Sequence, residues 1–133
     1  MKLSEAVRMG SQWADCHGPV FRGDACCAYG GIIKAYASEK KKNYFLIDPS
    51  TIEKAYPLLG SRAIHPVTNQ VTFVHDIIVN LFEGSRWSKS AIAEWVETIE
   101  KKLDAERANT TSPADASVES AKAEVGLPAV LST

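Results

Sequence analysis

The sequence predicts a mainly α-helical single domain of four to five helices, with at most one minor strand or hairpin and a flexible C-terminal tail. Three observations indicate this fold. The chain has 133 residues, which is the size of one domain. Several segments repeat apolar residues at three- and four-residue spacings, as helices do. All eleven aromatic residues lie before residue 107, so we predict a helical domain over residues 1–106 and a tail over residues 107–133.

The N-terminal half should contain two helices separated by a loop. Ser4 can cap a short helix that carries Ala6, Val7 and Trp13 on one side. Residues 15–24 hold two glycines and a proline and read as a loop. The next helix should run over Ala25–Ser38.

The middle of the chain predicts one short helix. The run Lys40–Lys42 is typical of a solvated turn, and Tyr44–Ile47 is an apolar run of strand length without an obvious partner. Asp48 can cap a helix that reaches Tyr56, with Pro49 in its first turn.

Two further helices are predicted before the tail. Val71–Glu83 fits a helix, although its β-branched residues leave a strand at Val71–Val74 as an alternative. Gly84 then stands where a helix commonly ends on a left-handed residue.

The clearest helix is Lys89–Glu106. Ser88 is its predicted N-cap, and Trp87 and Ile92 have the spacing of a hydrophobic staple. Its apolar stripe predicts that Trp87 is buried together with Ile92, Trp95, Val96, Ile99 and Leu103. In the tail, fifteen of 27 residues are Ala, Ser, Thr or Pro, a composition that buries little apolar surface.

Composition and charge exclude several classes of protein. Apolar residues make up 45% and charged residues 23%, as in soluble domains. A net charge of −1 argues against a general polyanion binder. The sequence has no apolar run of about 18 residues and no apolar signal region, so we expect no membrane partner. Three cysteines without a secretory signal predict reduced thiols in the cytoplasm.

Three short motifs follow one another along the chain. They are Leu3-Ser4-Glu5-Ala6-Val7-Arg8-Met9-Gly10, Cys27-Ala28-Tyr29-Gly30-Gly31, and Trp87-Ser88 followed by Ile92-Ala93-Glu94-Trp95-Val96. This order resembles the pattern LSEAIRxGA, CALGAA and ND…WSRExIAxWV of an uncharacterised family of small bacteriophage and prophage proteins, over about residues 3–100. The resemblance implies a phage or prophage origin and a helical fold, and it implies no activity.

The chain departs from that family pattern at three places. Gly31 stands where the family has Ala, and Phe82-Glu83 stand where it has Asn-Asp. Some relatives carry a Cys-Pro-x-Cys segment that suggests zinc, whereas this chain reads His65-Pro66-Val67. A zinc site of that kind is therefore not implied here.

The small residues at the start of the second helix form the predicted binding site for a ligand or partner: Cys27, Tyr29, Gly30 and Gly31. Glycines inside a helix permit close approach of another group. That group is either a neighbouring helix, for which we expect the C-terminal one through Val96 or Ile99, or an anion held at the helix N-terminus.

The cysteines, histidines and acidic residues suggest three other chemistries. A thiol at a helix N-terminus can be activated, so Cys27 with His17, His65 or His75 as base is the enzymatic alternative. Cys16-His17 and Cys26-Cys27 are adjacent pairs, which suit zinc poorly, so neither a metal nor a cofactor is predicted. Asp76, Asn80 and Glu83 read as a solvated face rather than a cation site.

Residues 71–106 also resemble a helix–turn–helix, but the second helix carries a net charge of −2, which disfavours nucleic acid. We therefore expect a non-enzymatic phage or prophage accessory protein of the host cytoplasm. It would bind a host or phage macromolecule, most simply a protein or a second copy of itself, or a small ligand. Host-defence inhibition and a virion-associated role both fit, and the alternative is a small enzyme using Cys27.

Overall fold

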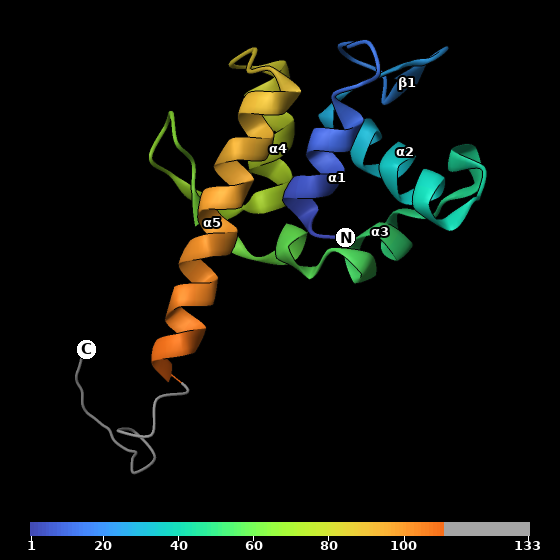
Figure 1. The fold of residues 1–133 in the computed structure, drawn as a ribbon. Coiled ribbons are helices and arrows are strands. Elements are labelled where there is room, and N and C mark those ends of the chain that lie inside the picture. Colours follow the sequence, from blue (N-terminus) through green and yellow to red (C-terminus); the bar gives the residue numbers. More distant parts are fainter. Residues whose placement is uncertain (111–133) are drawn as a thin grey trace. The chain divides into compact units, whose positions relative to one another are not determined.

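The structure, a computed structural model, describes residues 1–110 and confirms a small, mainly α-helical fold (Figure 1). Its compact units are Met1–Thr98 and Ile99–Thr133, and of the second unit only the end of helix α5 is described. Most of the predicted tail, residues 111–133, lies outside the described residues. The described helices are α1 (Leu3–Gly10), α2 (Ala28–Lys40), α3 (Pro49–Ala55), α4 (Val74–Glu83) and α5 (Lys89–Thr110), with 3₁₀ turns η1 (Tyr44–Leu46) and η2 (Pro57–Gly60).

One apolar core is built from the helices of the first unit. Its members come from every α-helix and from η2, and each is almost completely shielded from solvent. The largest fully buried side chains are Phe82, Ile32, Ile52, Leu59, Ile77, Ile78, Leu81 and Ile92. None of the helices in residues 1–110 is both long and apolar enough to cross a membrane.

Helix α1 begins earlier than the sequence predicts. It starts at Leu3, and the backbone N–H of Lys2 donates to the Glu5 carboxylate at 2.8 Å. Ser4 is therefore a buried residue of the first turn and not the cap. Trp13 follows the helix instead of extending its apolar side.

The predicted loop over residues 15–24 contains the first strand of a small hairpin. Strand β1 (Phe21–Arg22) pairs antiparallel with β2 (Ala25–Cys26). Helix α2 consequently begins at Ala28 and not at Ala25. Its end at Lys40 is followed by Lys41, whose φ of 56° is the left-handed cap.

Tyr44–Ile47, an apolar run of strand length in the sequence, does not form a strand. Tyr44–Leu46 forms the 3₁₀ turn η1, which Asn43 caps by accepting from the N–H of Phe45 at 3.0 Å. No neighbouring strand pairs with it within residues 1–110. The next prediction is confirmed, because Asp48 accepts from the N–H of Ser50 and Pro49 opens α3.

The segment Val71–Glu83 divides between the two predicted alternatives. Strand β4 (Val71–Phe73) pairs antiparallel with β3 (Arg62–Ile64), and α4 follows directly. Gly84 does not adopt the predicted left-handed conformation, since its φ is −87°. Arg86 adopts it instead, with a φ of 59°.

Helix α5 has the predicted start but a different burial pattern. The Ser88 hydroxyl accepts from the N–H of Ala91 at 3.1 Å, which confirms the cap, and the helix continues to Thr110. Ile92 and Val96 are fully buried. Trp87 and Trp95 are only half-buried, because they line an open cleft of about 490 Å³ together with Ala91, Glu94 and Thr98. Ile99 and Leu103 are also half-buried.

Candidate functional site

The small residues predicted as a site serve helix packing at the start of α2. A Cβ on Gly31 would lie 3.1 Å from the Cα of Gly10, and a Cβ on Gly10 would lie 2.7 Å from the Cα of Gly31. A Cβ on Gly30 would lie 2.5 Å from the carbonyl oxygen of Val20. Close approach was thus predicted correctly, but its partners are α1 and residue 20 rather than Val96 or Ile99 of the C-terminal helix.

Cys27 caps α2 instead of presenting a nucleophile. Its Sγ accepts from the N–H of Gly30 at 3.4 Å, and the residue is buried. Burial raises the pKa of the Cys27 thiol, and this effect exceeds the lowering by the Gly30 and Tyr29 N–H groups. The thiolate that nucleophilic catalysis needs is therefore disfavoured.

Each histidine has partners other than a cysteine. His17 stacks on Phe82 at 4.4 Å between ring centroids and lies 3.5 Å from the Glu83 carboxylate. His65 contacts Asn80, and His75 packs edge-on against Tyr29. These contacts do not form a cysteine–histidine pair at Cys27. In residues 1–110, no group of three His, Cys, Asp or Glu side chains is placed to hold a metal ion.

His65 organises the turn of the β3–β4 hairpin. Its Nδ1 accepts from the N–H groups of Val67 at 3.0 Å and Thr68 at 3.2 Å, so this nitrogen carries no proton. Its Nε2–H then donates to the Asn80 Oδ1 at 2.7 Å. The imidazole therefore links the hairpin to α4 as a neutral structural group.

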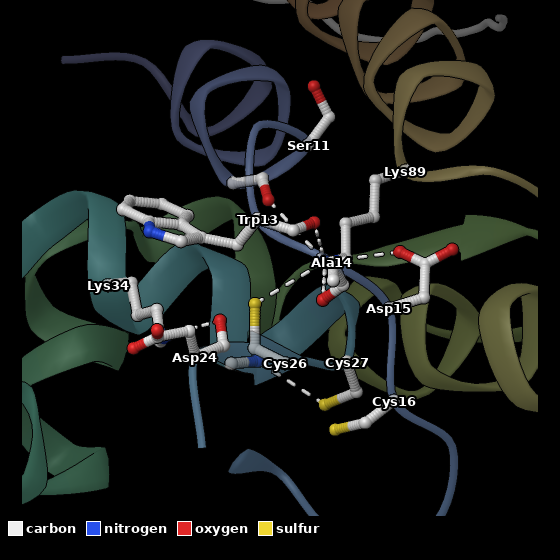
Figure 2. A network of polar contacts seen from close by, with 12 residues as sticks. Ser11, Trp13, Ala14, Asp15, Cys16, Asp24, Cys26, Cys27, Lys34 and Lys89 are labelled. Atoms are coloured by element: carbon white, nitrogen blue, oxygen red, sulfur yellow. Dashed lines mark hydrogen bonds and ion pairs between the residues drawn. The ribbon is translucent and has the colours of Figure 1, made fainter. Parts of the chain in front are cut away.

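A buried ammonium connects the start of α5 with the N-terminal segment (Figure 2). The side chain of Lys89 is 2% exposed, and its Nζ lies 3.2 Å from the Asp15 carboxylate. The same Nζ donates to the Trp13 carbonyl at 3.1 Å and to the Cys26 Sγ at 3.3 Å. Longer contacts of 3.5 and 3.4 Å reach the carbonyls of Gly10 and Ala14. So many acceptors satisfy a buried charge, and they fix the loop after α1 against α5.

A second buried lysine lies in an aromatic cage. Lys34 is 4% exposed, and its Nζ donates to the Asp24 carbonyl at 2.8 Å (Figure 2). Three rings surround this Nζ, with centroids 4.7 Å away for Tyr44, 5.4 Å for Trp13 and 5.9 Å for Phe21. Cation–π attraction of this kind is strongest where water is excluded. Lys34 therefore holds η1 against the β1–β2 hairpin.

The turn that Lys34 fixes presents two apolar side chains to solvent. Phe45 is 64% exposed and Leu46 is 81% exposed. Phe45 is oriented by the rings of Tyr44 and Phe21, at 4.4 and 5.5 Å between centroids. The exposed run Lys40–Lys42 immediately precedes this turn. We call Lys40–Lys42, Phe45 and Leu46 the basic–apolar tip.

A second exposed apolar surface lies on the β3–β4 hairpin. The register pairs Ile64 with Val71 and Arg62 with Phe73, so these four side chains share one face. Ile64, Val71 and Phe73 are 56%, 61% and 44% exposed, and Val67 in the turn is 52% exposed. The Arg62 guanidinium lies 5.4 Å from the centre of the Phe73 ring. We call Ile64, Val67, Val71 and Phe73 the hairpin face.

The opposite side of this hairpin borders a polar cleft along α4. The cleft has a volume of about 540 Å³ and is lined by His65, Thr68, Gln70, Thr72, His75, Asp76, Val79, Asn80 and Glu83. The Glu83 carboxylate is already occupied, since it accepts from the N–H of Gly18 at 3.2 Å and pairs with His17. The predicted solvated face of α4 is therefore the wall of a cleft.

Sequence reasoning missed the residues that the structure singles out. Lys34 and Lys89 carry no local signal of burial, since their acceptors are carbonyl groups from distant segments. The tip had a signal in the sequence KKKNYFL, in which three lysines and one asparagine precede aromatic and apolar residues. Comparison of the chain with models of protein families, with curated proteins and with solved structures gives no match.

Proposed function

We propose that this protein is a non-enzymatic binding protein whose hairpin face contacts another protein. The observation that carries the proposal is the set of four large apolar side chains on one small hairpin, each between 44% and 61% exposed. Contiguous exposed apolar residues commonly mark interaction sites, whereas isolated ones do not. The strand pairing holds Ile64, Val71 and Phe73 in one register, so little order has to be gained there on binding.

The chemistry of the hairpin face favours a protein partner. Alternate side chains of paired strands present a flat apolar surface that another strand or an apolar helix can cover. The only charged residue in the two strands is Arg62, at the edge of this surface. A partner surface with apolar residues and a carboxylate near Arg62 would match it. A second copy of the chain can supply the apolar part of that match but pairs arginine with arginine in a symmetric contact.

The three motifs near residues 3–10, 27–31 and 87–96 support a phage or prophage origin. On that basis we propose an accessory role in the host cytoplasm, such as inhibition of a host defence or a virion-associated function. Burial of Cys27 and the separate partners of the three histidines count against the enzymatic alternative.

The test is a comparison of two matched variants in infected host cells. The tagged wild-type protein is recovered together with its partners, and these are identified by mass spectrometry. The hairpin variant Ile64→Ser/Val71→Ser should lose a protein partner that the tip variant Phe45→Ser/Leu46→Ser retains. Light scattering of the purified protein decides whether the partner is a second copy. A partner retained equally by both variants would contradict the proposal.

A further inference from the structure

The basic–apolar tip carries an inference that is independent of the hairpin face. Its apolar members are the two most exposed large apolar residues in the described part of the chain, and three lysines precede them. Within residues 40–47 there is no acidic side chain. We propose that the basic–apolar tip docks this protein on the surface of membranes that contain anionic lipids.

The position of the two residue types suits a lipid surface. Phe45 and Leu46 project from η1 and can enter the boundary between headgroups and acyl chains. Lys40, Lys41 and Lys42 are exposed next to them, and flexible ammonium groups can reach lipid phosphates without a fixed geometry. Among residues 1–110, none of these three lysines forms an ion pair with a carboxylate, so their charge is available.

Ring contacts support the turn η1 at Tyr44 and Phe45 although Phe45 is exposed. The Lys34 ammonium lies 4.7 Å from the centre of the Tyr44 ring, and Tyr44 in turn contacts Phe45 at 4.4 Å between centroids. Phe21 of the β1–β2 hairpin contacts Phe45 at 5.5 Å between ring centroids. A supported Phe45 side chain loses little conformational freedom when it inserts, so ordering this side chain costs little of the binding free energy.

The charge distribution orients the molecule on such a surface. The whole chain carries −1, so the chain without the three lysines of the tip carries −4. A negative membrane surface therefore attracts the tip and repels the remainder of the protein. An acidic protein surface offers the same charges, but two projecting side chains at 64% and 81% exposure would need a matching pocket there, whereas a fluid bilayer needs none.

This inference departs from the sequence-based expectation of no membrane partner. That expectation rested on the absence of a spanning segment, and a surface-docked protein needs no such segment. As an apolar run, Tyr44–Ile47 does not indicate in the sequence that Phe45 and Leu46 are exposed, which η1 reveals.

The experiment is flotation of the full chain with vesicles of phosphatidylcholine alone or with about one-third phosphatidylserine. We expect binding to the mixed vesicles only, and loss of that binding between about 0.05 M and about 0.5 M salt. Lys40→Ala/Lys41→Ala/Lys42→Ala should weaken partitioning about 100-fold, at about fivefold for each lysine. Phe45→Ser/Leu46→Ser should weaken it at least about tenfold.

Two controls keep the outcome decisive. The hairpin variant Ile64→Ser/Val71→Ser removes two other exposed apolar residues, at 56% and 61% exposure, and should float like the wild-type protein. Thermal melts establish that each variant is folded. Equal binding to both kinds of vesicle, or full binding by the tip variants, would overturn the proposal. So would the absence of vesicle binding together with capture of an acidic protein that only the tip variants lose. Whether the hairpin variant loses its protein partner tests the proposed function alone and does not bear on membrane docking.

Discussion

Gly10 and Gly31 determine how closely α1 and α2 approach each other. The two Cα atoms are so near that a Cβ on either residue would contact the backbone of the other helix. The gain from this arrangement is close packing of the small and aliphatic residues around the crossing, such as Ala6, Ala28 and Ala35, each at most 1% exposed.

Gly10→Ala should therefore destabilise the protein. We expect the free energy of unfolding to fall by about 1–3 kcal/mol through overpacking, with the better helix propensity of Ala offsetting only part. Gly31→Ala should cost less, because its Cβ would lie at 3.1 Å and not at 2.7 Å. Urea denaturation measures both. Gly60→Ala is the control, since nothing lies within 4 Å of its Cβ. The reverse order of the two helix variants would contradict this account of the crossing.

Tyr56 should make stability depend on alkaline pH. Burial, followed by the negative charges of Glu39, ionised Tyr36 and Glu5, raises the pKa of Tyr56 from 10.0 to about 12. The unfolded chain then loses this proton near pH 10 while the folded chain keeps it. The contribution is complete below pH 10 and is lost as pH rises toward 12.

The measurement is the urea midpoint between about pH 8 and about pH 12, compared with Tyr56→Phe. The variant cannot ionise, so its midpoint should decline less steeply across this range. The raised pKa of Cys27 acts in the same direction in both proteins, so the difference isolates Tyr56. Parallel midpoints in the two proteins would show that Tyr56 ionises equally in the folded and unfolded states.

Elements with local start signals were predicted well, and elements defined by distant contacts were not. Helix α3 begins at Asp48-Pro49, and α5 is capped by Ser88, because a cap and its recipient N–H lie within three residues. The turn η1 depends on a cage around Lys34 built from residues far apart in sequence, which no local pattern reports. The left-handed residue after α4 was predicted at Gly84 but is Arg86. The reason is that the N–H groups of Gly84 and Ser85 both donate to the Asn80 carbonyl.

The revised burial of α5 changes which residue matters most for its packing. Ile92 is fully buried, so Ile92→Ala should lower the free energy of unfolding by about 2–5 kcal/mol. Trp95→Ala should cost less than the about 3–5 kcal/mol of a buried Trp, because one side of Trp95 lines an open cleft. Denaturation of both variants, with exposed Glu94→Ala as control, gives the order. A larger loss for Trp95→Ala would support the predicted stripe, in which Trp95 is largely buried.

The molecule as a whole places its core before the last turns of α5. Among the described residues, the most C-terminal member of the buried core is Val96. We therefore expect truncation after Thr110 to leave a cooperative melt with a midpoint within about 2 °C of the full chain. Calorimetry measures this. A loss of several degrees would show that residues 111–133 stabilise the domain, for which Leu127–Leu131 is the apolar candidate in the sequence.

The candidate sites were less predictable than the helices. Gly30 and Gly31 signalled close approach, but a glycine pattern does not identify the approaching group, and here that group is backbone from α1 and Val20. Both surfaces proposed for binding depend on exposure. Exposure is a property of the assembled fold, so Phe45 and Val71 could not be distinguished in the sequence from core residues.

The shell of acceptors around Lys89 has a consequence for how the protein opens. The ammonium cannot leave it unless the first turn of α5, which carries Lys89, separates from both the loop after α1 and strand β2, since these two segments supply the acceptors. Amide hydrogen exchange should report these three segments as one foldon with a common opening free energy. Lys89→Met should split that foldon, so that the α5 amides and the loop amides exchange at different rates.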